Sequence, residues 1–255
     1  MVNFQFVSDL HLEKRPLIPE NVVLESHGEV IALLGDIGSP YLPGLAEFIA
    51  WCSLRFVLVL FVPGNHEYQN SIGKTMTEVD NDIESICSKH HNVIFMRNMV
   101  VPYKNIMFIG STLWTHLPPQ HHMLIKQHIS DYKHIWKTQS ELIQPEDINK
   151  EHATNRMFIE HEVSNALKEG MQPVVLTHHP PSKVGTSMPQ FKDDILQVAY
   201  SSQISFPEGM IKLWCAGHTH HNYRHDHEGY LLVSNQYGYG DKGARGYDMN
   251  NIIRL

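Results

Sequence analysis

Short apolar runs bounded by turn residues recur along the whole chain, and they predict β-strands. The runs are rich in Val, Ile, Leu and Phe, and Gly, Pro, Asn, Asp or Ser separates them, as is usual for the strands of a layered protein. The predicted strands are residues 2–7, 30–34, 56–62, 93–96, 106–109, 174–176, 211–215, 230–233 and 252–253. We therefore expect a protein built on short strands throughout its length.

Between several of these runs the apolar period changes to that of a helix with one buried face. Helical spacing occurs at Leu45, Phe48, Ile49 and Cys52, at Val79, Ile83, Ile86 and Cys87, and at Ile159, Val163, Ala166 and Leu167. The third helix is predicted at about 155–169, before Gly170. Strand and helix alternate in the first half, and strands follow one another more closely after residue 106. This order predicts an α/β (α+β) fold, a two-sheet β-sandwich flanked by helices, in a single domain over residues 1–255.

Residues 113–153 interrupt the alternation, and we expect an inserted helical cap there. Pro118 and Pro119 open the segment, Ile125, Ile129, Tyr132 and Trp136 follow at near-helical spacing, and Pro145 is expected to break that pattern. The cap carries Lys126, Lys133 and Lys137 against Asp131. A solvated helix face explains these charges most simply. The alternative is a lid whose cations attract an anionic substrate.

Five short polar motifs follow predicted strands, where layered α/β proteins place their ligands. They are Asp9-Leu10-His11, Gly35-Asp36, Gly64-Asn65-His66-Glu67, Thr177-His178-His179-Pro180 and Gly217-His218-Thr219-His220. Each motif alone is weak evidence, because Gly-Asp is a common turn and a lone His is usually just hydrogen-bonded. Five in succession are not explained by chance. In an extended segment residues i and i+2 point the same way, so Asp9 with His11, and His218 with His220, can face one pocket.

The donor types indicate a metal site. The chain contains 19 His, the commonest metal ligand, and the motifs combine imidazole, carboxylate and one amide oxygen without a thiolate. This mixture suits Mn, Fe, Zn or Co ions rather than Ca, and it does not choose among those four. The donors outnumber the needs of one tetrahedral ion. We therefore expect two divalent or trivalent metal ions.

Charge and composition exclude several classes of protein. Lys and Arg total 20 against 27 Asp and Glu, a net charge of −7, without the basic runs by which a protein holds nucleic acid phosphates. The apolar run at 56–62 ends at Pro63, far short of the roughly 20 residues of a membrane helix. The three widely spaced cysteines and the absence of a signal-like N-terminus predict a cytoplasmic protein with reduced thiols.

The five motifs together resemble those of the calcineurin-like metallophosphoesterases, in the same order and intact, over most of the chain. The resemblance implies that Asp9, His11, Asp36 and His220 hold one metal and that Asp36, Asn65, His178 and His218 hold the second. Asp36 would bridge the two ions. His66 would be the general acid beside the leaving group, and a hydroxide shared by the metals would attack phosphorus.

The substrate is less well specified. Phosphoprotein phosphatases of this superfamily carry Asp-Arg-Gly after the bridging Asp, whereas Ile37-Gly38-Ser39 follows Asp36 here. The residues in and around the motifs are similar to those of a group of small, mostly uncharacterised metallophosphoesterases. Candidate substrate-binding residues are Asp131, Tyr132, His179 and Asn235.

These observations predict an enzyme that hydrolyses phosphomonoesters or phosphodiesters of a small molecule. The first alternative is a nuclease acting on DNA or RNA ends, although repair nucleases of the superfamily ordinarily add DNA-binding segments for which 255 residues leave little room. The second is a non-catalytic scaffold on the same fold, against which the complete ligand set counts. The sequence leaves the metal, the substrate and the oligomeric state open.

Overall fold

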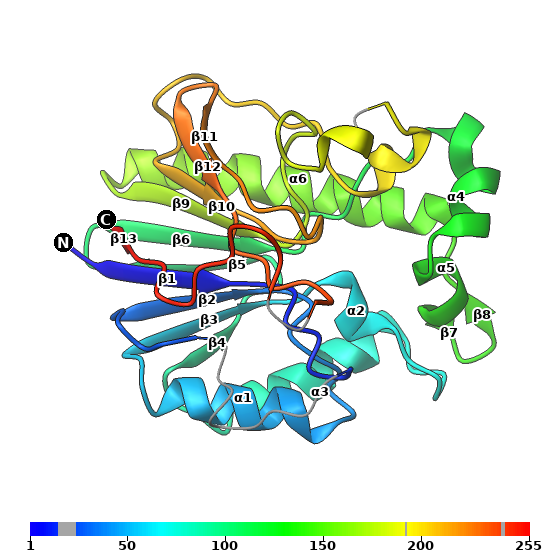
Figure 1. Ribbon diagram of the computed structural model, residues 1–255, viewed down its shortest axis with the longest axis horizontal. Helices are drawn as coiled ribbons and strands as arrows, with labels where there is room; N and C mark the ends of the chain where they lie inside the picture. The colour runs from blue at the N-terminus through cyan, green and yellow to red at the C-terminus, as the bar shows by residue number, and fades with distance from the viewer. Residues whose placement is uncertain (15–23, 192, 241–242) are drawn as a thin grey trace.

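Two β-sheets form the centre of the protein (Figure 1). The computed structural model describes residues 1–14, 24–191, 193–240 and 243–255. The first sheet has the order β13 (Ile253–Arg254), β1 (Asn3–Val7), β2 (Val30–Leu34), β3 (Leu58–Val62) and β4 (Val93–Phe95). The second has the order β11 (Arg224–His227), β12 (Tyr230–Val233), β10 (Leu213–Cys215), β9 (Gln172–Thr177), β6 (Ile106–Ser111) and β5 (Met99–Tyr103).

The two faces of β2 enter different apolar layers. Val30, Ala32 and Leu34 belong to the core between the two sheets, whereas Ile31 and Leu33 belong to the core beneath the first sheet. This alternation follows from the two-residue period of a strand. A parallel strand that is buried on both faces needs apolar residues at every position, which explains why β2 consists of Val-Ile-Ala-Leu-Leu.

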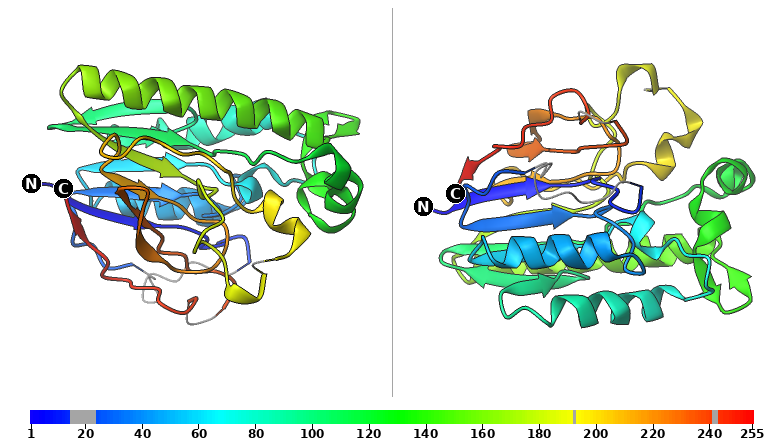
Figure 2. Two further views of the ribbon diagram at one scale, coloured as in Figure 1. Left: turned by 90° about the horizontal axis from the view of Figure 1, so that it is seen from above. Right: turned by 60° about the horizontal axis from the view of Figure 1, so that its bottom comes forward.

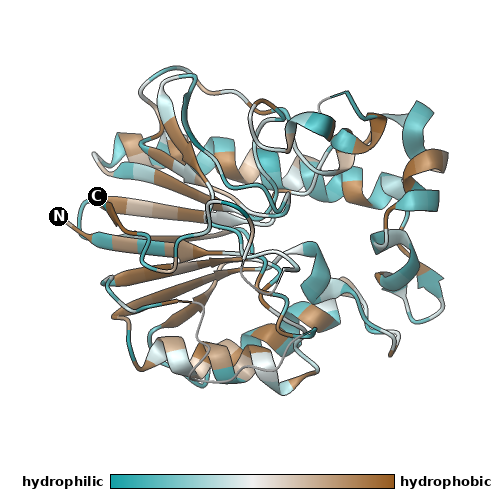
Figure 3. Cartoon of the chain, in the orientation of Figure 1, coloured by the Kyte–Doolittle hydropathy of each residue, from teal (hydrophilic) through white to brown (hydrophobic). Residues whose placement is uncertain are grey.

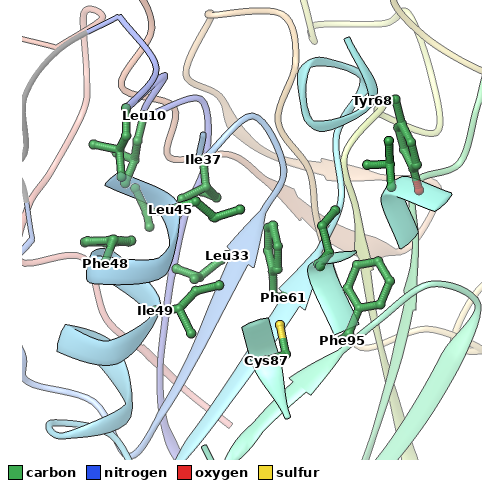
Figure 4. Close-up of a cluster of buried hydrophobic side chains, with 14 of the residues drawn as sticks. Leu10, Leu33, Ile37, Leu45, Phe48, Ile49, Phe61, Tyr68, Cys87 and Phe95 are labelled. Carbon is green, nitrogen blue, oxygen red and sulfur yellow. The ribbon is translucent and has the colours of Figure 1, made fainter. Parts of the chain in front are cut away.

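Helices cover the outer faces of both sheets, as Figures 1 and 2 show. On the first sheet lie α1 (Pro43–Ser53) and α3 (Met76–Cys87). Figure 4 shows Leu45 and Ile49 of α1 directed toward Leu33 and Phe61 of the sheet, and Phe48 of the same helix belongs to the same apolar cluster. The predicted apolar stripe thus forms the contact with the sheet, and the hydropathy view shows apolar strands between more polar helices (Figure 3).

The second sheet is covered by α6 (Pro145–Lys168), whose buried residues include Ile159, Val163 and Ala166. The helix begins at Pro145 and not near residue 155, so the expectation that this proline breaks a helical pattern was wrong. Proline suits the first helical turn because its missing N–H has no partner there. The amide N–H of Gln144 donates to Asp147 Oδ2 at 3.1 Å and caps this end.

The segment between β6 and α6 contains several short elements instead of one long helix. It holds the 3₁₀ turn η2 (Pro119–His121), α4 (His122–His128), α5 (Asp131–His134) and a hairpin of β7 (Trp136–Thr138) and β8 (Glu141–Leu142). Ile125 and Tyr132 are buried in the helical stripe, but Trp136 lies in β7. Further 3₁₀ turns lie at η3 (Pro189–Phe191) and η4 (Ile195–Ala199).

Sequence patterns missed β5 and β11, which lie at the edge of the second sheet. Four residues of β11, Arg224 to His227, are polar, and β5 contains Pro102, so neither resembles a buried strand. Edge strands tolerate both features because one side of the strand has no ladder to complete.

Most pairings between the remaining strands are parallel. In the first sheet β1, β2, β3 and β4 run in one direction, and in the second β6, β9, β10 and β12 do so. Parallel strands bring their carboxyl ends to a common edge, and α2 (Asn65–Tyr68) follows β3 there. The predicted fold class, two sheets flanked by helices, is confirmed. Among the helices described here, none combines the length and the apolar character needed to cross a bilayer.

Candidate metal centre

The loops after the parallel strands bring the polar motifs together. Asp9 follows β1, Asp36 follows β2, Asn65 follows β3, and His178 and His218 follow β9 and β10. The side chains of these loops are largely withdrawn from solvent: Asp9 and His178 are 0% exposed and Asp36 is 2% exposed. Buried carboxylates and imidazoles in one place require partners, because burial of an unpaired charge is strongly unfavourable.

Five of the clustered residues have left-handed backbone conformations. The φ angles are 57° at Asp9, 50° at His11, 53° at Asp36, 73° at His218 and 51° at His220. Asp and His are among the few residues other than Gly that adopt this region with appreciable frequency. A left-handed residue turns the chain sharply, and here these turns follow directly on the ends of β1, β2 and β10.

One group of donor atoms is formed by Asp9, His11 and His220, whose atoms all lie within 4.8 Å of one another. His220 Nε2 is 3.3 Å from Asp9 Oδ1 and 3.1 Å from His11 Nε2. His11 Nε2 is also 3.9 Å from Asp36 Oδ2. The nitrogen lone pairs therefore converge on one region beside two carboxylates.

A second group consists of Asp36, His178 and His218. His178 Nε2 lies 3.4 Å from Asp36 Oδ1, 3.1 Å from Asn65 Oδ1 and 3.1 Å from His218 Nδ1. Asp36 thus presents Oδ2 to the first group and Oδ1 to the second. Among the described residues, it is the carboxylate whose two oxygens face both groups.

Hydrogen bonds fix which histidine nitrogens are bare. The carbonyl of Leu34 accepts from His178 Nδ1 at 2.8 Å, and the carboxylate of Glu13 lies 3.0 Å from His11 Nδ1. With the proton on Nδ1, each ring offers the lone pair of Nε2 to the donor groups, which is the usual arrangement behind metal-binding histidines. Asn65 is oriented in the same way, because its Nδ2 donates to Asp131 Oδ1 at 2.8 Å and its Oδ1 is left facing His178.

The protonation states of these groups also fit cations. Burial alone would raise the pKa of Asp9, but the hydrogen bond and the charge of His220 hold that pKa well below its ordinary value. Burial, followed by the neighbouring His179 and His178, lowers the pKa of His218 well below its ordinary value. Metal ligands must be deprotonated, and these shifts favour the carboxylate form of Asp9 and the neutral ring of His218. At His220 burial lowers the pKa, but the hydrogen bond and the charge of Asp9 outweigh it and raise the pKa. The residues of both donor groups therefore fit divalent metal ions.

The carboxylate of Glu67 braces the loops that carry Asp36 and Asn65. It is fully buried and accepts four backbone N–H bonds, from Asp36 at 2.9 Å, Ile37 at 2.7 Å, Gly38 at 3.2 Å and Gly64 at 2.7 Å. Burial and the nearby charge of Asp36 raise the pKa of Glu67 to about 7. The loops approach closely, since a Cβ at Gly64 would lie 2.3 Å from Asp36 Oδ1.

His66 lies beside the donor groups, and its ring is directed differently from those of the candidate ligands. Its Nδ1 is 3.7 Å from Glu13 Oε1, and its Nε2 is 3.3 Å from the hydroxyl of Tyr239 and 4.0 Å from Asp36 Oδ2. Burial disfavours the imidazolium, but the carboxylates of Asp36 and Glu13 raise the pKa of His66 to about 9. These carboxylates favour the protonated form of the ring at the edge of the site.

A cavity of about 340 Å³ opens onto both donor groups. Asp36, Asn65, His66, His218 and His220 line its floor together with Asp131, so six of the predicted site residues meet there. The predicted cap contributes residues 128–131 to its wall. Tyr200 and Tyr239 also line the cavity, and sequence reasoning had singled out neither of them.

The other predicted substrate-binding residues lie outside that lining. Tyr132 is part of the apolar core beneath the first sheet. His179 is buried, with Nδ1 3.2 Å from the carbonyl of Thr112, and its ring lies 4.2 Å from that of His218. Asn235 is buried and bonds the backbone of Phe6 and Asp248. Their assignment to substrate binding stays a prediction.

Known proteins resemble the chain in sequence and in fold. It is 29% identical to the uncharacterised protein L509 of Acanthamoeba polyphaga mimivirus, over 92% of this chain and 90% of that protein. The fold is similar to that of a phosphopantetheinyl hydrolase, PptH, from Mycobacterium tuberculosis, with a TM-score of 0.69, 14% identity and coverage of 93% and 89% of the two chains. A dimetal phosphatase from Danio rerio has a TM-score of 0.51, 12% identity and coverage of 91% and 86%.

The family is shown by a sequence model. The model of the calcineurin-like phosphoesterases matches residues 3–222, which include all five motifs. The match agrees with the fold and with donor groups suited to divalent metal ions. This chain therefore belongs to the calcineurin-like phosphoesterase family and is a metal-dependent phosphoesterase.

Proposed function

We propose that the protein holds two metal ions and hydrolyses phosphomonoesters or phosphodiesters of a small molecule. The observation that carries this proposal is the position of Asp36, whose Oδ1 faces His178 and whose Oδ2 faces His11. A carboxylate with one oxygen toward each donor group is suited to bridge two cations. Asp9, His11, Asp36 and His220 would hold one ion, and Asp36, Asn65, His178 and His218 the other.

The residues around the cavity divide the chemical work. Bound metal ions supply Lewis-acid chemistry, since they neutralise phosphoryl oxygens and make hydroxide available near neutral pH. His66 donates the Nε2 proton to the leaving oxygen: the N–H bond breaks, the O–H bond forms, and the electron pair stays on the nitrogen. The cavity of about 340 Å³ favours a small substrate over a nucleic acid duplex.

We further propose that residues 1–255 form one domain and that the segment at about 113–153 covers the site. Residues 128–131 of this segment contribute to the cavity wall, which supports such a role. We also propose that the protein acts in the cytoplasm. Cys52, Cys87 and Cys215 are buried and unpaired, as expected in a reducing compartment.

The bridging role of Asp36 predicts the metal stoichiometry. Wild-type protein reconstituted with Mn²⁺ is expected to bind two ions per chain. Asp36→Asn is expected to weaken Mn²⁺ binding at both positions by more than about 100-fold, because loss of a hydrogen-bond partner behind a metal ligand already lowers affinity about 10- to 100-fold and Asp36 would be a ligand itself. Metal analysis after equilibrium dialysis measures both. Asp226→Asn, on the edge strand β11, is the matched control. Saturation at one ion per chain, unchanged in Asp36→Asn, would contradict the two-metal proposal.

The origin of the nucleophile can be tested by isotope. We expect solvent oxygen to attack phosphorus directly, so that a single turnover in ¹⁸O-labelled water places one label in the released phosphate. Mass spectrometry of the product measures this. Label in the phosphate shows that water attacks phosphorus and not carbon, but hydrolysis of a phosphorylated side chain would give the same label. A phosphorylated protein trapped by rapid acid quench would show that a side chain attacks first.

A further inference from the structure

Glu13 lies between two histidines to which the proposed function gives different tasks. Its Oε1 is 3.0 Å from Nδ1 of His11, a candidate metal ligand, and 3.7 Å from Nδ1 of His66, the candidate acid. One candidate ligand atom from each of the three residues lies within 4.8 Å of the other two. The side chain of Glu13 is 17% exposed, and its Oε2 is buried without a hydrogen-bond partner among the described residues.

The backbone holds Glu13 in this place. The N–H groups of His11 and Leu12 donate to the carbonyls of Asp36 and Ile37, at 2.9 Å each, and the N–H of Lys14 closes a turn by donating to the carbonyl of His11 at 2.9 Å. Glu13 is therefore presented by a turn fastened to the loop that carries Asp36. A largely buried carboxylate is unfavourable unless charged or polar groups face it, and those that face this one are the two imidazoles.

We propose that Glu13 is a positioning residue that couples the metal site to the general acid. By accepting the Nδ1 proton of His11, its carboxylate leaves the lone pair of His11 Nε2 directed toward Asp36 and His220. The same oxygen faces His66 Nδ1 and turns His66 Nε2 toward the cavity. This inference rests on the proposed function, because it takes His66 as the acid.

Glu13 accepts no proton in the reaction. When the Nε2–H bond of His66 breaks and the leaving oxygen takes the proton, the ring becomes neutral and keeps Nδ1–H toward Glu13. At 3.7 Å the carboxylate is beyond hydrogen-bond distance, but its charge stabilises the imidazolium before transfer and favours the ring orientation with Nδ1 toward Glu13. One side chain would thereby maintain the angle between a metal ligand and a proton donor that lie on different loops.

The test compares Glu13→Gln and Glu13→Ala with a matched control. Glutamine has the same shape and keeps one acceptor oxygen, whereas alanine removes both contacts. Glu25→Gln removes another carboxylate that contacts the histidine two residues away, Glu25 Oε2 to His27 Nε2 at 3.0 Å, on an exposed surface. Two quantities are measured: Mn²⁺ affinity by chelator competition, and kcat for phosphoesters whose leaving groups differ in pKa.

We expect Mn²⁺ affinity to fall about 10- to 100-fold in Glu13→Ala, as for other outer partners of metal-binding histidines, and less in Glu13→Gln. At saturating metal, kcat on alkyl esters should fall more than kcat on nitrophenyl esters, and Glu25→Gln should match wild type in both measurements. A role in folding alone predicts equal losses on all esters and lowered thermal stability.

Four results would overturn the inference. If Glu13→Ala keeps wild-type affinity and leaving-group dependence while His66→Asn shows its selective loss, the proposed function stands and the inference fails. If affinity falls but leaving-group dependence is unchanged, Glu13 serves His11 alone. Three Mn²⁺ ions in wild type, with one lost in Glu13→Gln, would make Glu13 a metal ligand. If His66→Asn itself loses activity equally on all esters, the acid role and the coupling fail together.

Discussion

Replacement of His66 by Asn is expected to lower kcat on alkyl phosphoesters by about 10²- to 10⁴-fold, the usual contribution of general acid catalysis. An alkoxide must be protonated as it leaves, whereas a nitrophenolate is stable enough to leave without a proton. The loss on nitrophenyl esters should therefore be much smaller. His66 is not assigned to either group of candidate ligands, and its Nε2 lies 3.3 Å from the hydroxyl of Tyr239 and 4.0 Å from Asp36 Oδ2, so both metals should be retained.

The measurement is a leaving-group series on wild type and His66→Asn, with metal content determined on the same samples. His161→Asn, on the exposed side of α6, serves as the control and should follow wild type. A steeper dependence of kcat on leaving-group pKa in His66→Asn supports the acid role. Parallel slopes, or loss of metal together with activity, would instead assign His66 to ordering the loop.

Glu67→Ala is expected to lower the free energy of unfolding by at least about 3 kcal/mol, because four buried N–H donors lose their acceptor and each unsatisfied donor costs about 1 to 3 kcal/mol. The donors belong to the loops after β2 and β3, so metal binding should weaken as well. Glu67→Gln should also be destabilised, since an amide N–H would then face backbone N–H groups.

Urea unfolding of the metal-free proteins measures this effect without the contribution of bound ions. Glu78→Ala provides the comparison: Glu78 accepts from the N–H and the hydroxyl of Thr75 at the exposed start of α3, and loss of such a cap costs about 1 kcal/mol. If Glu67→Ala loses no more stability than Glu78→Ala, the four hydrogen bonds accepted by Glu67 do not hold the two loops together.

The sheet strands and two of the main helices were predictable because their signals are local. A strand such as β2, buried on both faces, shows an unbroken apolar run, and α1 and α3 show one apolar stripe each. The start of α6 was missed because a proline can either interrupt a helix or occupy its first turn. The sequence pattern alone did not show which of the two applies to Pro145. The edge strands β5 and β11 were missed because Pro102 interrupts β5 and all four residues of β11 are polar.

The candidate site was predictable to the extent that parallel strands share one edge. Asp36 and His178 are far apart in sequence, but each follows a strand, so their meeting follows from topology. Glu67 stood within a motif, but its role depends on amides of another loop. The sequence assigned no role to Glu13 or Tyr239, since their contacts with His66 exist only once three loops have folded together.

The left-handed backbone at five residues lowers the stability of the protein at the positions that its activity requires. These residues are Asp9, His11, Asp36, His218 and His220. At about 1 kcal/mol or more each, five such residues cost on the order of 5 kcal/mol, comparable to the whole net stability of many domains. Glycine would relieve the backbone at every one of these positions and would remove a candidate metal ligand each time. Selection for higher folding stability and selection for catalysis thus favour different residues in these loops. Substitutions that raise stability without loss of activity belong in the sandwich core and the outer helices, where no such conflict exists.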